Sequence, residues 1–209
     1  RSFLDRYALS RDQARIMGEQ LASLLDGIGA DSDNTDGPQD QIIAALAPAK
    51  LRVAPVISLS IPFGGDNYGD KQLTDEATQT VAGVGHIQAL WEGIKSLDMK
   101  DQVTFALLNV FGRNLQRNVH GGRGHNRNHG VMVAFGPGVR PGVIGEIDGN
   151  LQATGIDPMT GAAFESGGID PEETREAAGR SLLVALGHSH PTVDSRVLPG
   201  PIVDAFLIV

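Results

Sequence analysis

The chain has 209 residues, of which 41% are hydrophobic and 20% charged, so it can build a core and is not a disordered tail. Lys and Arg total 17 against 25 Asp and Glu, a formal charge of −8. This balance argues against a general binder of nucleic acid or anionic membranes, because the average surface repels both. The absence of cysteine excludes disulfide scaffolds, thiolate zinc sites and cysteine catalysis. No apolar run approaches the ~20 residues that span a bilayer.

Helices are predicted in four parts of the chain. In the first, Ser10 fits an N-cap, an apolar stripe at helical spacing follows, and Gly27 ends the helix. A short second helix begins at Pro38, which suits the first helical position. The third, residues 74–97, has a predicted core face of Val81, Val84, Ile87, Leu90, Trp91, Ile94 and Leu97, and the fourth covers residues 170–186.

Three apolar runs without helical periodicity predict buried strands, at residues 53–61, 103–110 and 131–135. Residues 150–168 are rich in Gly, Pro, Thr and Asp and predict a surface hairpin or loop. Strands that alternate with helices indicate an α/β fold with a mainly parallel sheet covered on both faces. No repeat or linker divides the chain, so we expect a single domain over residues 1–209.

One stretch of the chain is strongly basic. There is no acidic residue between Asp101 and Glu146, and the stretch holds Arg113, Arg117, Arg123, Arg127 and Arg140. Within it, the glycines of segment 111–130 let backbone N–H groups turn toward a ligand, and the arginines offer planar paired donors to a phosphate, sulfate or carboxylate. A focused positive patch on an acidic protein favours a small anion over a polymer. The alternative is that these arginines neutralise the acidic remainder or form a subunit contact.

Asp66 is the first candidate ligand. It follows the predicted strand 53–61 in a glycine-rich loop, at the end of a strand where parallel sheets bind ligands. The alternative for Asp66 is an Asx turn or a helix cap. The histidines of segment 111–130 are further candidates, although a single histidine is more often solvated or hydrogen-bonded than a ligand. Loops 62–70 and 111–130 both start at a predicted strand end, so we expect them to meet at one edge of the sheet.

The order of these motifs resembles a known family. The segments are Phe63–Tyr68 after a strand, Asn109–Asn114 at the end of the next strand, Gly122–Asn126, and the run Val131–Val139. This order is similar to the C-terminal half of the bacterial family called domain of unknown function 1501, which belongs to the alkaline phosphatase and sulfatase superfamily. The resemblance covers residues 45–143, with a weaker echo in the predicted helix 170–186.

The resemblance implies an alkaline phosphatase-like, three-layer α/β sandwich with a mainly parallel sheet, incomplete at its N-terminus. The early strand that carries the nucleophile in the superfamily is not in this chain, so an N-terminal segment or another subunit would complete the fold. Asp and His from the two loops hold a metal pair in the superfamily, and they map onto Asp66 and His125. The family also implies export, with a periplasmic or secreted location.

This sequence departs from the family at two ligand positions. Tyr68 stands where the first loop usually has histidine, and Gly124 where the second has aspartate. Asp70 and His129 are nearby substitutes as metal ligands. In this hypothesis arginines hold the anion, and their positive charge would weaken the binding of two divalent cations nearby. One metal, zinc or calcium, is therefore expected, and no metal is an equal alternative. The expected anion-binding residues are Arg113, Arg123 and Arg127.

We therefore expect an exported phosphatase- or sulfatase-like protein that binds or hydrolyses a phosphate or sulfate ester. Its hydrolase activity is expected to be weak or absent, because two ligand positions are lost. The expected partner is a small anionic ligand, not nucleic acid. The alternative is a non-enzymatic structural or interaction subunit that uses loop 111–130 to grip an acidic protein surface.

Overall fold

The computed structural model describes residues 3–27, 37–108, 112–126, 130–164, 168–197 and 199–208. The chain forms two compact units, each described by itself below. Unit 1 is Arg1–Gly65 with Ala77–Met99, and unit 2 is Asp66–Glu76 with Lys100–Val209. The single domain expected over residues 1–209 stays a prediction. Among the described helices, none is both long and apolar enough to cross a membrane.

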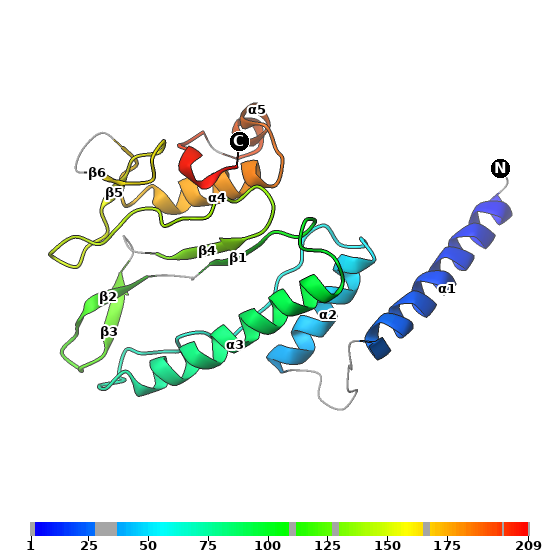
Figure 1. Ribbon diagram of the computed structural model, residues 1–209, viewed down its shortest axis with the longest axis horizontal. Helices are drawn as coiled ribbons and strands as arrows, with labels where there is room; N and C mark the ends of the chain where they lie inside the picture. Colours follow the sequence, from blue (N-terminus) through cyan, green and yellow to red (C-terminus); the bar gives the residue numbers. More distant parts are fainter. Residues whose placement is uncertain are drawn as a thin grey trace. The chain divides into compact units, whose positions relative to one another are not determined.

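Unit 1 consists mainly of helices, at the places that the sequence predicts. They are α1 (Phe3–Gly27), α2 (Pro38–Lys50) and most of α3 (Thr74–Ser96) (Figure 1). Ser10 lies inside α1, so its predicted role as N-cap is wrong. Pro38 occupies the start of α2 as expected, because a proline there gives up no helical hydrogen bond.

The core of unit 1 lies where α2 packs closely on α3. Gly93 of α3 faces Leu46 of α2, and a Cβ on this glycine would come within 2.4 Å of Leu46 Cδ1. Leu90 and Ile94 are buried as predicted, but Val81 is 74% exposed and Val84 52%. The predicted core face of α3 is therefore right near its C-terminal end and wrong at these two earlier positions.

The predicted strand over residues 53–61 is absent, because the structure describes this run without any strand. Val56 is 80% exposed, and the backbone N–H of Ser60 bonds the Gln41 side chain at 3.2 Å. An apolar, β-branched run predicts a strand only where a partner strand accepts its backbone hydrogen bonds, and none pairs with it among the described residues.

The sheets of unit 2 are small and antiparallel, so the predicted mainly parallel, three-layer α/β sandwich is wrong. β1 (Phe105–Leu108) pairs with β4 (Met132–Phe135), and β2 (Gly112–Arg117) pairs with β3 (Arg123–Asn126). Parallel neighbours need a long crossover, usually a helix. Between β1 and β4 the chain instead contains β2 and β3, so the β2–β3 pair is nested inside the β1–β4 pair along the sequence.

The predicted strand positions were nearly right for β1 and β4, whereas β2 and β3 lie in a segment expected to be a loop. Their sequences, GRNLQR and RGHN, contain one apolar side chain between them. They therefore lack the alternation of apolar and polar residues that predicts a strand.

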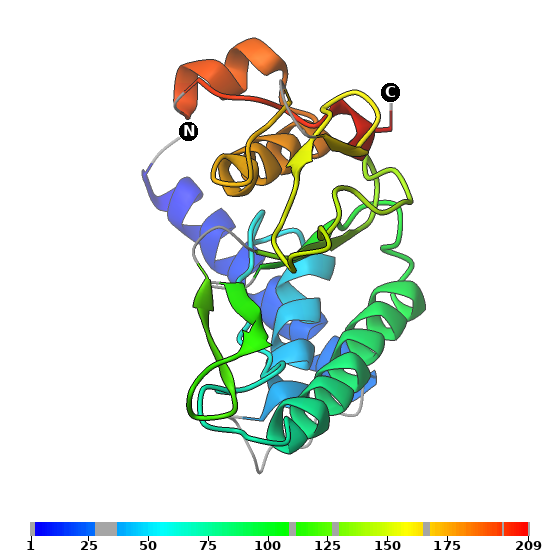
Figure 2. The same ribbon diagram turned by 90° about the vertical axis from the view of Figure 1, so that its left-hand side faces the viewer.

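The C-terminal part of unit 2 forms its core. The predicted hairpin is present as β5 (Gly155–Ile156) paired with β6 (Ala163–Phe164), and the predicted last helix as α4 (Thr174–Ala185). α5 (His190–Arg196) and the 3-10 turn η1 (Asp204–Phe206) follow. One face of β4 packs on this cluster, and the β2–β3 hairpin lies at the other end of unit 2 from α5 (Figures 1 and 2). The buried residues of the cluster are Ile169, Ala177, Val203, Phe206 and Leu207.

Candidate functional site

The loop 66–70 lies directly against the β2–β3 hairpin of unit 2. The backbone N–H of Arg123 donates to the carbonyl of Asn67 at 3.0 Å, and the Asn118 side-chain amide donates to the carbonyl of Tyr68 at 3.0 Å. Gly122 fits beneath these carbonyls, and a Cβ there would lie 2.1 Å from Asn67 O. The hairpin therefore fixes the loop through its backbone.

This contact brings together three of the predicted site residues. Arg113 on β2 and His125 on β3 are directly opposite in the ladder, so their side chains share one face of the hairpin. The Arg113 guanidinium donates to Asp66 Oδ1 at 3.1 Å, and the Tyr68 backbone N–H donates to the same oxygen at 3.2 Å. We call Asp66, Arg113 and His125 the triad.

The electrostatics of the triad favour an ionised Asp66. The backbone N–H of Tyr68 and then the Arg113 guanidinium hold the pKa of this carboxyl below its ordinary value of 3.8, and the charge of His125 adds to the effect. The Asp66 side chain is 82% exposed, whereas that of Arg113 is only 18% exposed. The carboxylate thus lies at the surface, bound to a largely buried cation.

Arg123 supports the loop from beneath. Its guanidinium donates to the carbonyls of Leu115 and Asn114, and its Nε lies 3.7 Å from Glu76 Oε2. The buried Asn67 side chain donates to the same Glu76 carboxylate. An anion at Arg123 would have to compete with these contacts, so its predicted anion-binding role stays a prediction.

Asp70 caps α3. Its carboxylate accepts the backbone N–H groups of Thr74 at 3.1 Å, Asp75 at 2.9 Å and Glu76 at 3.1 Å, in the manner of an N-terminal cap. Desolvation raises the pKa of Asp70, but the backbone N–H groups, led by that of Glu76, outweigh it and lower the pKa below 3.8. A metal would have to displace several hydrogen bonds to use this carboxylate.

The predicted metal site is only partly described. Asp66 and His125 lie close to each other, but Arg127 and His129 are outside the described residues. Among the residues that the structure does describe, no group of three or more His, Asp or Glu side chains could hold a metal ion. Asp66 also shares its Oδ1 with a guanidinium, whose charge opposes a cation. The metal-ligand roles and the expected zinc or calcium stay predictions.

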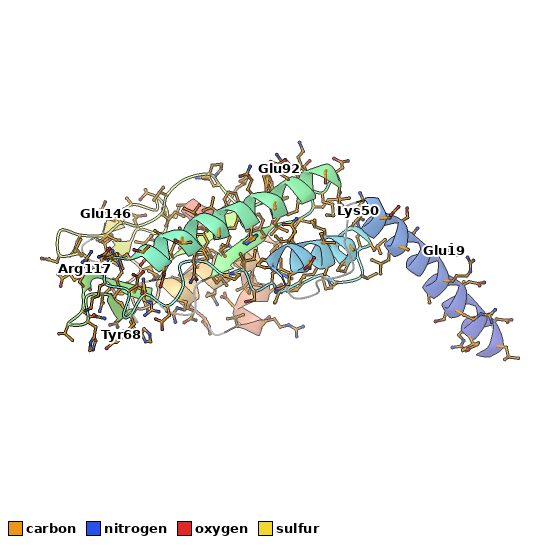
Figure 3. The ribbon with its side chains drawn as sticks, turned by 90° about the horizontal axis from the view of Figure 1, so that it is seen from below. Glu19, Lys50, Tyr68, Glu92, Arg117 and Glu146 are labelled. Atoms are coloured by element: carbon orange, nitrogen blue, oxygen red, sulfur yellow. The ribbon has the colours of Figure 1, made fainter. Side chains whose placement is uncertain are left out.

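Two further residues of this site form a contact that the sequence did not predict. The rings of Tyr68 and His120 form a tilted pair, with centroids 5.4 Å apart and planes at 44°. Tyr68 is 46% exposed and lies at the same end of unit 2 as Arg117, with both side chains projecting from the protein (Figure 3). Sequence spacing gave no signal for this pair, because fifty residues separate Tyr68 from the hairpin turn.

Two hollows of unit 2 lie away from the triad. One, of about 510 Å³, adjoins the C-terminal end of α4 and is lined by His190, Asp204 and apolar residues. A second, of about 300 Å³, runs along β2 beside Gln116, Arg117 and Gln152. Neither of these two hollows is lined by a residue of the triad.

Comparison of the chain with protein-family models, curated proteins and solved structures gave no match. The resemblance described above therefore stays a prediction, and the functional argument rests on the geometry of unit 2.

Proposed function

We propose that unit 2 binds a phosphate or sulfate group, free or as an ester, at the triad. One observation carries the proposal: the Arg113 guanidinium and the Tyr68 N–H already hold one oxygen of a carboxylate, that of Asp66. Guanidinium and N–H groups that converge on a carboxylate oxygen also suit a phosphate or sulfate oxygen. Asp66 thus acts as an internal occupant of the site.

An external anion can displace this occupant. The Asp66 side chain is 82% exposed, so water solvates its carboxylate and weakens its hold on Arg113. Arg113 is held in place by a second bond, from its Nη1 to the carbonyl of Arg123 at 3.3 Å. When Asp66 turns into solvent, the guanidinium therefore keeps its orientation beside His125.

The surroundings favour an anion as well. The stretch between Asp101 and Glu146 contains five arginines and no acidic residue, although the whole chain carries −8. Such a local excess raises the concentration of small anions near the surface. We propose binding in preference to hydrolysis, because Tyr68 and Gly124 replace two of the metal ligands that support hydrolysis in the superfamily that the sequence resembles.

The test is titration of the purified protein with inorganic phosphate and with sulfate, followed by calorimetry. Arg113→Met is expected to weaken binding by at least about tenfold, the loss of one charge-assisted hydrogen bond. Arg140→Met, in the same basic stretch but outside the hairpin, is the matched control and should bind as the native chain does. Equal losses in the two variants would show a diffuse charge effect and contradict the site.

Asp66→Asn separates this proposal from the metal hypothesis. If Asp66 is an internal competitor, removal of its charge should strengthen phosphate binding in metal-free buffer. If Asp66 is a metal ligand, the same variant should lose binding, and chelation of the native protein should do so too. The same samples, assayed with 4-nitrophenyl phosphate and sulfate, measure the ester hydrolysis that the family resemblance implies.

A second candidate is recognition of an acidic protein by the turn of the hairpin. The observation that favours it is the exposure of this turn, where Val119 is 96% exposed and Arg117 also faces solvent. Arg117→Met distinguishes the two candidates, because it should weaken a protein contact at the turn more than it weakens phosphate binding at Arg113.

A further inference from the structure

We infer that the Tyr68–His120 ring pair binds a flat ring attached to the anion, so that the preferred ligand class is a nucleoside monophosphate and not a bare anion. This inference rests on the function proposed above and names the ligand class of the same site. It starts from the position of the two rings, which the triad does not use.

The rings are held beside the triad by backbone contacts. The Tyr68 N–H binds Asp66 Oδ1, and the Tyr68 carbonyl accepts the Asn118 side-chain amide at 3.0 Å. On the other side of the pair, the His120 N–H donates to Asn118 Oδ1 at 2.8 Å. One asparagine therefore binds both ring-bearing segments and sets the distance between the rings.

The ring pair is a surface on which another ring can stack. Aromatic rings attract each other at centroid separations such as the observed 5.4 Å, in offset or tilted arrangements. Tyr68 is nevertheless 46% exposed, so part of the ring is still open to solvent. Stacking on an exposed aromatic side chain accepts any base, because every base has a π-face.

The rings lie beside the triad. Tyr68 is two residues from Asp66, and its N–H and the Arg113 guanidinium donate to the same Asp66 oxygen. A nucleoside monophosphate has a phosphate and a base joined by a ribose, so it offers an anion for Arg113 and a ring for the exposed part of Tyr68 in one molecule.

The charge of the protein limits the ligand to a short one. A single phosphate is attracted by the basic stretch, but a polymer also meets the acidic remainder of a chain that carries −8. The expected ligand is thus a mononucleotide, and a long single strand of nucleic acid should bind no better per site.

The test compares AMP with ribose 5-phosphate, which has the same phosphate and sugar but no base. The native protein should bind AMP at least about fivefold more tightly, the lower end of measured base stacking on aromatic side chains. Tyr68→Ala should bring the ratio of the two affinities close to one, and Tyr68→Phe should keep it. Bound AMP should also shift the NMR signals of the His120 ring protons, whereas ribose 5-phosphate should not.

The outcomes separate the two proposals. Equal affinities for AMP and ribose 5-phosphate in the native protein would overturn the ring-binding inference and leave the oxyanion site in place. If neither ligand nor inorganic phosphate binds, both proposals are wrong. A preference for AMP that survives Tyr68→Ala would also contradict the inference, because the base would then bind elsewhere.

Discussion

Gly122 provides the sharpest test of how the site is assembled. Its position allows the hairpin to approach the loop so closely that a Cβ would lie 2.1 Å from Asn67 O and 2.3 Å from Tyr68 O. Both atoms belong to the backbone and cannot rotate away as a side chain can. Gly122→Ala must therefore separate the loop 66–70 from the hairpin.

The expected cost is that of overpacking, about 1–3 kcal/mol. For a unit of this size, such a loss lowers the Tm by roughly 3–12 °C. Gly149→Ala is the matched control, since nothing lies within 4 Å of the Cβ that it would add. Phosphate affinity should change in the first variant and not in the second, because the competing Asp66 carboxylate and the Tyr68 N–H donor both move away from Arg113.

Calorimetric melting and amide hydrogen exchange measure the effect. The Arg123 N–H, which donates to Asn67 O, should lose its protection from exchange in Gly122→Ala and retain it in Gly149→Ala. If the two variants have the same Tm and both keep this protection, the close approach of loop and hairpin does not exist in solution and the reasoning is refuted.

Three other predictions concern single side chains. Ser181→Ala should lower the free energy of unfolding by about 1–3 kcal/mol in urea, because the buried Ser181 Oγ accepts the Val203 N–H at 2.8 Å; an equal effect of the exposed Ser195→Ala would contradict this. Asp70→Ala should reduce stability at pH 7, measured by thermal melting across a pH series. The lowered pKa of Asp70 means that its contribution is present above pH 3.8 and disappears as pH falls through the folded-state pKa, so native protein and variant should converge in acid; a constant gap would contradict the cap. The carboxyl of Asp66 should titrate below 3.8 by NMR, and Arg113→Met should raise this pKa; an unchanged midpoint would mean that the ion pair does not form.

The helices of this protein were predictable because their periodicity is local. Pro38 and the residues after Thr74 carry start signals that operate within a few residues, and α2 and α3 begin there. The parallel sheet was not predictable in the same way. An apolar run such as residues 53–61 indicates that a strand is possible, but whether a partner strand pairs with it depends on distant segments. In the described structure no strand pairs with this run.

The proximity within the triad was expected for a reason that proved wrong. The prediction placed Asp66 and His125 at one edge of a parallel sheet. The structure instead brings Arg113 opposite His125 in an antiparallel ladder, and Arg113 then binds Asp66. Segment composition revealed the basic character of the site, whereas the roles of Asn67, Asn118 and Glu76 depend on contacts that no motif encodes.

The nesting of β2 and β3 between β1 and β4 has a kinetic consequence. The turn after Arg117 closes a short loop, whereas direct pairing of Leu108 with Met132 encloses the whole inner hairpin and costs more chain entropy. Pairing from the turn outward is thus the cheaper route. The β2–β3 hairpin, which carries Arg113 and His125, would then form before the β1–β4 ladder, so defects at the turn should slow refolding of the entire unit.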